Sequence, residues 1–237
     1  MREFGIAELK STDANCDRSQ YWLFIYKGDP MTHIYYNLTI LVAYLIGSSN
    51  MSYYISKLKK VDIKGRGSQN LGASNTVILM GWRAGVLVGA HDIAKGVLAV
   101  LLANAFFDLP YIGAVAGVSC ILGHIFPFYL KFKGGKGFAS FIGVAFALNW
   151  KWSLILAAFI IAAILITVYL VVGTTLTVIL VPAVFGITEH SLILSGILLI
   201  ATVIIVAKHW ENYVRIFKGE EYRLLKAFIK ERYGGNQ

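Results

Sequence analysis

Residues 191–207 read SLILSGILLIATVIIVA, a run without a charged residue. An α-helix rises about 1.5 Å per residue, so a straight helix needs about 20 apolar residues to cross a bilayer and seldom fewer than about 17. This run therefore predicts a membrane-spanning helix. Further apolar runs occupy residues 34–56, 76–91, 97–109, 111–130, 138–150, 152–172 and 175–188.

The whole chain has the composition of an integral membrane protein. Of its 237 residues, 57% are hydrophobic and 15% are charged, with a mean hydropathy of +0.65. Soluble domains are nearer to about 45–50% apolar and about 25% charged. A single aqueous core of this size cannot bury so much apolar surface. The composition predicts an all-α polytopic membrane helical bundle, and it excludes a disordered chain, a secreted disulfide scaffold and an ordinary cytosolic enzyme.

The positive charges fall in three clusters, within a net charge of +9. Under the positive-inside rule, such clusters mark cytoplasmic loops. A basic loop at a membrane surface also attracts anionic substrates. The clusters are Lys57, Lys59, Lys60, Lys64 and Arg66, then Lys131, Lys133 and Lys136, then Lys208, Arg215, Lys218, Arg223, Lys226, Lys230 and Arg232.

If all three clusters are cytoplasmic, an even number of crossings must separate each from the next. Four apolar runs lie between the second and third clusters, but three lie between the first and second. The run 76–91 contains Arg83, His91 and several glycines, so we expect it to be re-entrant or interfacial. The count becomes about seven spans, with the N-terminus outside and the C-terminus in the cytoplasm.

The chain divides into three parts by composition. Residues 1–33 form a polar N-terminal extension without a signal-peptide pattern. Residues 34–221 form one membrane domain, and residues 222–237 form a basic cytoplasmic tail. Cys16 and Cys120 give no disulfide framework. No CxxC, HExxH or Cys/His cluster occurs, so we expect no metal and no cofactor.

Two glycine-rich stretches interrupt the apolar pattern. Residues 65–75 read GRGSQNLGASN, where a tight backbone and polar side chains can surround an anion, although a plain flexible loop has a similar composition. Residues 123–137 read GHIFPFYLKFKGGKG, in which glycines alternate with lysines. Backbone donors beside ammonium groups suit phosphate oxygens, so this second stretch predicts a phosphate site.

A third polar stretch follows the last apolar run. Residues 208–215 read KHWENYVR, and His209, Asn212 and Arg215 recur at helical spacing, so they can share one face. The alternative is an interfacial helix end anchored by its aromatic residues. Earlier in the chain, Asp92 and Lys95 are three residues apart, and the simplest interpretation is a neutralising ion pair.

Together these stretches resemble the bacterial acyl-phosphate:glycerol-3-phosphate acyltransferase family over roughly residues 34–221. The matching motifs are 67–75, 123–127 with 132–137, 208–221, the DxxKG of 92–96, and the pair Gly47-Ser48. The chain departs from the family pattern at Gln69, where glycine is usual, and at Ile78, where arginine is usual.

The resemblance implies a bacterial inner-membrane enzyme that transfers an acyl group from acyl phosphate to the 1-hydroxyl of glycerol 3-phosphate, giving lysophosphatidic acid and phosphate. The expected partners are these two substrates and membrane lipid. The competing acyl-CoA-dependent class carries HxxxxD, and none of the five histidines has an aspartate five residues later. A transporter of phosphorylated anions and a divergent inactive homologue are the alternatives.

Site residues fall into three expected groups, carried by the motifs above. Catalytic positions are His209, Asn212 and Ser68, with His209 either a general base near its ordinary pKa or a group that orients a substrate. Substrate phosphates are expected on Lys133, Gly134, Gly135, Lys136, Asn70, Asn75, Arg66 and Arg215, including the N–H groups of the two glycines. Supporting positions are Ser48, Asp92, Lys95, His124 and Glu221.

Overall fold

A computed structural model describes residues 30–167 and 169–221, and within these ranges the regular structure is helical without a strand. The expected N-terminal extension and basic tail lie largely outside the described residues. Contacts divide the chain into two units, Met1–Asn37 and Leu38–Gln237. The first contributes only residues 30–37 to the description. The predicted all-α membrane fold is confirmed.

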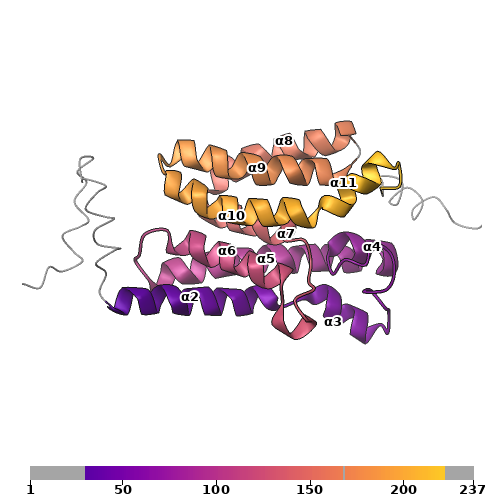
Figure 1. Cartoon of the computed structure of the whole chain (residues 1–237), viewed down its shortest axis with the longest axis horizontal. Helices are drawn as coiled ribbons and strands as arrows, with labels where there is room; N and C mark the ends of the chain where they lie inside the picture. The colour runs from indigo at the N-terminus through magenta and orange to yellow at the C-terminus, as the bar shows by residue number, and fades with distance from the viewer. Residues whose placement is uncertain (1–29, 168, 222–237) are drawn as a thin grey trace, which may run out of the picture. The chain divides into compact units, whose positions relative to one another are not determined.

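The helices follow one another along the chain, and the longest connections among the described residues are 59–72 and 131–137 (Figure 1). They are α2 (Pro30–Ser48), α3 (Met51–Leu58), α4 (Ala73–Met80), α5 (Trp82–Phe106), α6 (Ile112–Ile125), the 3₁₀ helix η2 (Phe128–Leu130), α7 (Phe138–Leu148), α8 (Trp150–Thr167), α9 (Leu170–Thr188), α10 (Leu192–Lys208) and α11 (Trp210–Phe217).

Four segments are long and apolar enough to cross a membrane: Pro30–Leu58, Trp82–Phe106, Ile112–Leu130 and Leu170–Thr188. A fifth follows if α10 and α11, which meet at a 43° bend, count as one span. The shorter apolar helices α7 and α8 do not meet the length criterion. The predicted total of seven spans is therefore not confirmed by length and composition.

The first apolar run, 34–56, lies within the candidate span Pro30–Leu58, which consists of two helices, α2 and α3. Asn50 accepts a hydrogen bond from Tyr53 N–H and begins α3 as its N-cap. The run 76–91 is not one re-entrant segment. It divides at Gly81, whose φ of 84° ends α4, and α5 then continues through residues 92–96 to Phe106. The buried charges pair inside α5, so the helix passes through them without a break.

Small residues let the helices of the second unit approach closely. A Cβ on Gly47 would lie 1.9 Å from the Cys120 carbonyl oxygen, and one on Gly96 would lie 2.4 Å from that of Ser140. Between helices in lipid, packing and hydrogen bonds stabilise association, because lipid tails are as apolar as leucine. The main core is formed mostly by buried side chains of α6, α7, α9 and α10, and its largest fully buried members include Phe141, Phe185 and Leu198.

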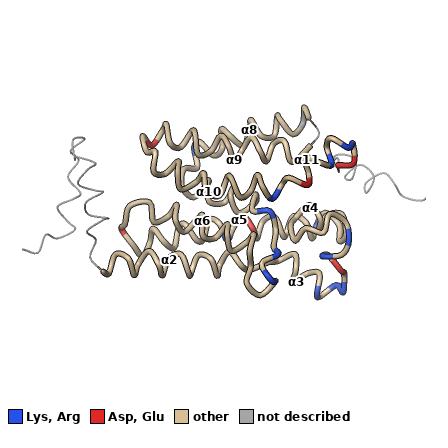
Figure 2. Tube along the Cα trace, viewed as in Figure 1, with Lys and Arg blue, Asp and Glu red and all other residues tan. Residues whose placement is uncertain are grey.

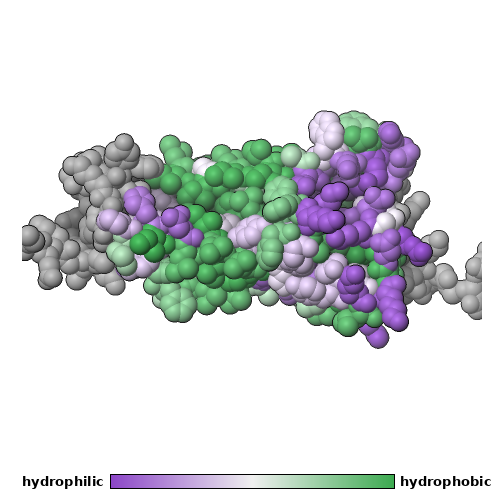
Figure 3. Space-filling model, turned by 60° about the horizontal axis from the view of Figure 1, so that its bottom comes forward, coloured by the Kyte–Doolittle hydropathy of each residue, from purple (hydrophilic) through white to green (hydrophobic). Residues whose placement is uncertain are grey.

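Most Lys and Arg positions of the described residues gather at one end of the helices (Figure 2). This end carries α3, α4, α11 and the connections beside them, and a broad hydrophobic surface adjoins its hydrophilic surface (Figure 3). Polar segments that are far apart in the sequence therefore lie at the same end of the bundle.

Candidate functional site

The second and third polar stretches meet through a chain of hydrogen bonds. Lys136 Nζ, just before α7, donates to Asn212 Oδ1 in α11. Asn212 Nδ2 donates to Glu221 Oε1 at 2.5 Å, and Arg215 Nε donates to Glu221 Oε2 at 2.8 Å. A carboxylate held by two donors fixes both of them, so Glu221 orients Asn212 and Arg215 beside the lysine.

Lys136 is half-buried, which makes its ammonium group unusually acidic. Burial and the neighbouring Arg215 guanidinium, partly offset by Glu221 and Glu211, lower the pKa of Lys136 to about 8. The cluster therefore combines positive charge with incomplete hydration, which favours the binding of an anion.

His209 lies in the bend between α10 and α11 and is 7% exposed. Its Nδ1 is 2.8 Å from the Ile205 carbonyl oxygen. A carbonyl oxygen only accepts, so Nδ1 carries the proton and Nε2 is left as an acceptor. Burial lowers the pKa of His209 to about 4, so the imidazole is neutral at physiological pH.

The glycine turn before α7 is built differently from the expectation. Gly134 N–H donates to the Ile125 carbonyl at 3.0 Å, and Gly135 N–H donates to the His124 carbonyl at 3.1 Å. Both N–H groups are therefore used within the protein, and the expectation that they bind phosphate is wrong. The glycines are needed for close approach instead, since a Cβ on Gly134 would lie 2.1 Å from the His124 carbonyl oxygen. Lys133, in the same turn, is exposed.

In the loop 65–75, Asn75 is fully buried and organises the backbone. Its Nδ2 donates to the carbonyls of Ile63 and Arg66, and its Oδ1 accepts from Ser68 N–H at 2.8 Å. Gly67 and Gln69 have φ of 63° and 58°, a region that glycine adopts without strain, which explains why glycine is the usual residue at position 69.

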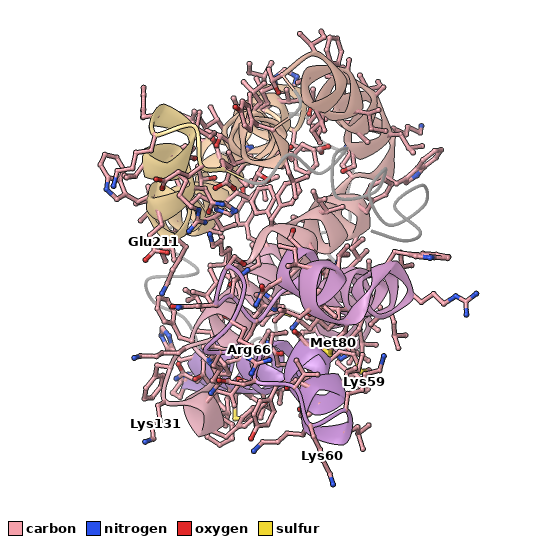
Figure 4. The ribbon with its side chains drawn as sticks, turned by 90° about the vertical axis from the view of Figure 1, so that its right-hand side faces the viewer. Lys59, Lys60, Arg66, Met80, Lys131 and Glu211 are labelled. Carbon is pink, nitrogen blue, oxygen red and sulfur yellow. The ribbon has the colours of Figure 1, made fainter. Side chains whose placement is uncertain are left out.

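The exposed side chain of Arg66 lies at the polar end together with Lys59, Lys60, Lys131 and Glu211 (Figure 4). The half-buried side chains of Ser68 and Asn70 belong to the same loop. The hydrogen bonds of the Asn75 side chain all go to the loop itself, whereas Ser68 and Asn70 are partly exposed and Arg66 is exposed.

Three residues that the sequence analysis did not single out, Tyr54, Tyr129 and Asn50, connect the α2–α3 region with the segments around Tyr129 and Leu71. Tyr129 OH donates to the Ser48 carbonyl at 2.9 Å and lies 3.1 Å from Tyr54 OH. Ser48 Oγ itself donates to the Tyr44 carbonyl. Asn50 Nδ2 donates to the Leu71 carbonyl at 3.2 Å. An asparagine directly before an apolar helical pattern is an N-cap signal, so Asn50 was open to prediction from the sequence.

The expected ion pair between Asp92 and Lys95 is present, with Oδ1 and Nζ 2.9 Å apart, and His124 lies against it. All three are buried below the polar end. Among the described residues, no group of His, Cys, Asp or Glu side chains is arranged to hold a metal ion.

An apolar groove of about 270 Å³ lies between α7, α8 and α9. Its lining begins at Phe138, two residues after Lys136, and includes Ala157 and Ile160 of α8 and Val181 of α9. The groove therefore begins in the first turn of α7, directly after the segment that carries Lys136.

Known proteins match this chain over most of its length. The family model described as "Glycerol-3-phosphate acyltransferase" matches residues 37–219. The glycerol-3-phosphate acyltransferase of Thermoanaerobacter pseudethanolicus is 35% identical over 196 residues, which cover 81% of this chain and 96% of the relative. That of Coxiella burnetii is 36% identical over 186 residues, which cover 78% of this chain and 95% of the relative.

Solved structures agree with the sequence relatives. The crystal structure of PlsY (YgiH), an integral membrane glycerol 3-phosphate acyltransferase in its glycerol 3-phosphate form, superposes with a TM-score of 0.75 at 29% identity, covering 80% of this chain and 95% of that one. Its lysphosphatidic acid form gives 0.73 at 29% identity, over 82% and 98% of the two chains. With an all-helical membrane fold and matching polar motifs at one end, the chain belongs to the glycerol-3-phosphate acyltransferase family.

Proposed function

We propose that this protein transfers an acyl group from acyl phosphate to the 1-hydroxyl of glycerol 3-phosphate, with lysophosphatidic acid and inorganic phosphate as products. The observation that carries the proposal is the joining of Lys136, Asn212, Arg215 and Glu221 beside a neutral His209. Both substrates are phosphorylated, and this cluster offers a half-buried ammonium and a guanidinium to them. The relatives support glycerol 3-phosphate as the acceptor.

The chemistry needs positioning more than strong acid or base catalysis. The 1-hydroxyl oxygen attacks the acyl carbonyl carbon, the bond from that carbon to the phosphate oxygen breaks, and the hydroxyl proton passes to the departing phosphate. Phosphate is a good leaving group, so the protein's contribution is to hold the two substrates together and stabilise the developing charge. Lys136 and Arg215 supply that positive charge, and Ser68, Asn70 and Arg66 hold the other polar head group.

His209 acts in this scheme as an acceptor that orients glycerol 3-phosphate. Its Nδ1 proton is committed to Ile205, so the lone pair of Nε2 is available to accept from a substrate hydroxyl. We assign the proton transfer itself to the departing phosphate. Asn212 fixes the Lys136 ammonium, and Asn75 holds the loop that carries Ser68.

The polar end is proposed to face the cytoplasm of a bacterial inner membrane. Its excess of Lys and Arg supports this orientation under the positive-inside rule. Glycerol 3-phosphate is a water-soluble anion, and a basic surface at the membrane boundary raises its local concentration. The same orientation places residues 34–221 as the catalytic membrane domain and 222–237 as a cytoplasmic tail.

The donor's acyl chain is proposed to lie in the groove between α7, α8 and α9. Replacing Ala157 with phenylalanine is expected to fill part of this groove and to shift donor preference toward shorter chains, because a well-packed apolar site does not admit extra volume. Relative kcat/KM for donors of different chain length measures the shift. Ala158→Phe is the matched control, since Ala158 is exposed and outside the groove lining. An unchanged preference in Ala157→Phe with full activity would contradict this placement.

The acidity of Lys136 predicts an alkaline limit on activity. The ammonium loses its proton as the pH rises through about 8, so kcat/KM for glycerol 3-phosphate should fall about tenfold per pH unit above that value. Lys136→Arg is expected to remove this limit, because a guanidinium keeps its proton. Initial rates from about pH 6 to 10 test both enzymes, and a wild-type profile that stays flat to about pH 10 would contradict a role for this ammonium.

The proposed donor is tested with purified protein in lipid, glycerol 3-phosphate, and either acyl phosphate or acyl-CoA of the same chain length. We expect phosphate release and lysolipid formation in equal amounts with acyl phosphate and little product with acyl-CoA. Efficient turnover of acyl-CoA would overturn the donor assignment. Folded protein with no product from either donor would favour the inactive homologue.

A further inference from the structure

A buried polar cluster lies within the helices below the glycine turn. Asp92 and Lys95 of α5 and His124 of α6 are 2%, 4% and 3% exposed. Lys95 Nζ lies 2.9 Å from Asp92 Oδ1 and 2.8 Å from His124 Nδ1, and those two acceptors are 3.4 Å apart. Ionisable residues inside a membrane span are costly, so their presence points to a function.

All three donors of the Lys95 ammonium have partners. The third donates to the Ser49 carbonyl at 2.7 Å, in the break between α2 and α3. An ammonium only donates, so His124 Nδ1 must accept and the neutral ring carries its proton on Nε2. The His124 ring is therefore held in one tautomer and one orientation by the ion pair.

One side of the cluster supports the turn that carries Lys136. A Cβ on Gly135 would lie 2.1 Å from His124 Nε2, so the ring directly abuts the Gly135 backbone. The Gly135 N–H also donates to the His124 carbonyl at 3.1 Å. The glycine turn therefore contacts His124 at two points, the imidazole ring and the main-chain carbonyl.

The other side of the cluster leads to the loop 65–75. Ser49, which accepts from Lys95, is followed by Asn50, and Asn50 Nδ2 donates to the Leu71 carbonyl at 3.2 Å. His91 adds a second link, with Nε2 3.1 Å from Ser49 Oγ and Nδ1 3.4 Å from Asp92 Oδ1. Both polar segments proposed to bind substrate are therefore connected to the same buried ion pair.

We propose that Asp92, Lys95 and His124 are positioning residues that set the separation of the loop 65–75 from the glycine turn, and so hold Lys136 in the place where it binds glycerol 3-phosphate. This inference rests on the proposed function. Mutual neutralisation needs only the i,i+3 contact between Asp92 and Lys95. The additional contacts reach the backbone of the α2–α3 break and of the glycine turn. A positioning role requires such contacts, whereas neutralising the two buried charges does not.

The test removes both charges together, because removing one would leave the other buried and unpaired. In Asp92→Asn/Lys95→Met, we expect KM for glycerol 3-phosphate to rise about 10- to 100-fold with a smaller change in kcat, since small misplacements of binding groups have effects of this size. The matched control is Ser119→Ala, also buried in α6, whose hydroxyl bonds only to the Val115 carbonyl within its own helix. His124→Gln is a second variant that keeps the ion pair and removes the ring, and it should change KM in the same direction.

A distance measurement tests the cluster independently of catalysis. Spin labels at Gln69→Cys and Lys131→Cys, both exposed, in a Cys16→Ser background report the separation of the two segments in full-length protein. We expect a single narrow distance distribution that broadens or shifts in the double variant and in His124→Gln but not in Ser119→Ala. An unchanged distribution with unchanged KM in either folded variant overturns the inference. If the parent protein lacks transferase activity, the proposed function fails, and the distances alone decide the positioning role.

Discussion

Replacing Lys136 with methionine is expected to lower kcat/KM for glycerol 3-phosphate by about 10³-fold, the largest single effect in this enzyme. Methionine retains the length and apolar stem of lysine but removes the half-buried positive charge that pairs with Asn212. The folded structure should tolerate the change, because the buried lysine carries a desolvation cost that methionine does not. Phosphate release under subsaturating glycerol 3-phosphate measures the loss.

Lys131→Met is the appropriate control for this variant. Lys131 is exposed at the same end of the molecule, in the connection that leads to the glycine turn. Its loss changes the net charge by the same amount without touching the cluster, so activity should change by less than about twofold at physiological ionic strength. Equal losses in the two variants would mean that Lys136 acts only through the general surface charge.

Changes at His209 are expected to have the second-largest effect and to separate two mechanisms. His209→Ala removes the acceptor that orients glycerol 3-phosphate and should lower kcat/KM by about 10²-fold. His209→Gln restores an acceptor oxygen at a similar distance from the backbone, so it should recover most of the turnover. The comparison is made at saturating acyl phosphate, with kcat and KM for glycerol 3-phosphate determined separately.

A general base would give a different pattern at this position. Glutamine cannot take a proton at neutral pH, so a base role would leave His209→Gln as impaired as His209→Ala, with a loss of about 10²- to 10⁴-fold in kcat. That outcome would transfer the proton step from the departing phosphate to the imidazole. The low pKa of His209 is compatible with either role, because both need the neutral ring.

The sequence predicted the fold class and the polar end well, for physical reasons. Long uncharged runs have few alternatives to membrane helices, and clustered Lys and Arg residues gather on one side of a membrane. The spacing of Asp92 and Lys95 predicted their ion pair, because residues three apart are neighbours on a helix. That same pairing hid the continuity of α5, since the sequence pattern shows a polar interruption where the structure has an unbroken helix.

Tertiary contacts decided what the sequence left open. The glycine-rich turn predicted a phosphate cradle made of backbone N–H groups, but the N–H groups of Gly134 and Gly135 donate to the Ile125 and His124 carbonyls at the end of α6. These carbonyls belong to the same stretch, 123–137, but the spacing of its residues does not indicate that the turn folds back onto them. Similarly, the buried position of Asn75 and the link from Tyr129 to Ser48 depend on segments that only the fold brings together. Local sequence patterns indicated which polar residues are candidates for the site. The fold determined which of them keep a hydrogen-bonding group that a substrate can use.

The central claim is that segments around Lys136 and His209 bind glycerol 3-phosphate together, and protection of Lys136 from chemical modification tests it most directly. At pH about 8 this lysine is partly neutral and reacts with a small acylating reagent, and mass spectrometry follows each lysine separately. We expect glycerol 3-phosphate to slow the modification of Lys136 at least about tenfold while exposed Lys60 reacts unchanged, and His209→Ala to abolish the protection. Equal modification of Lys136 with and without glycerol 3-phosphate, at concentrations that saturate turnover, would contradict the account.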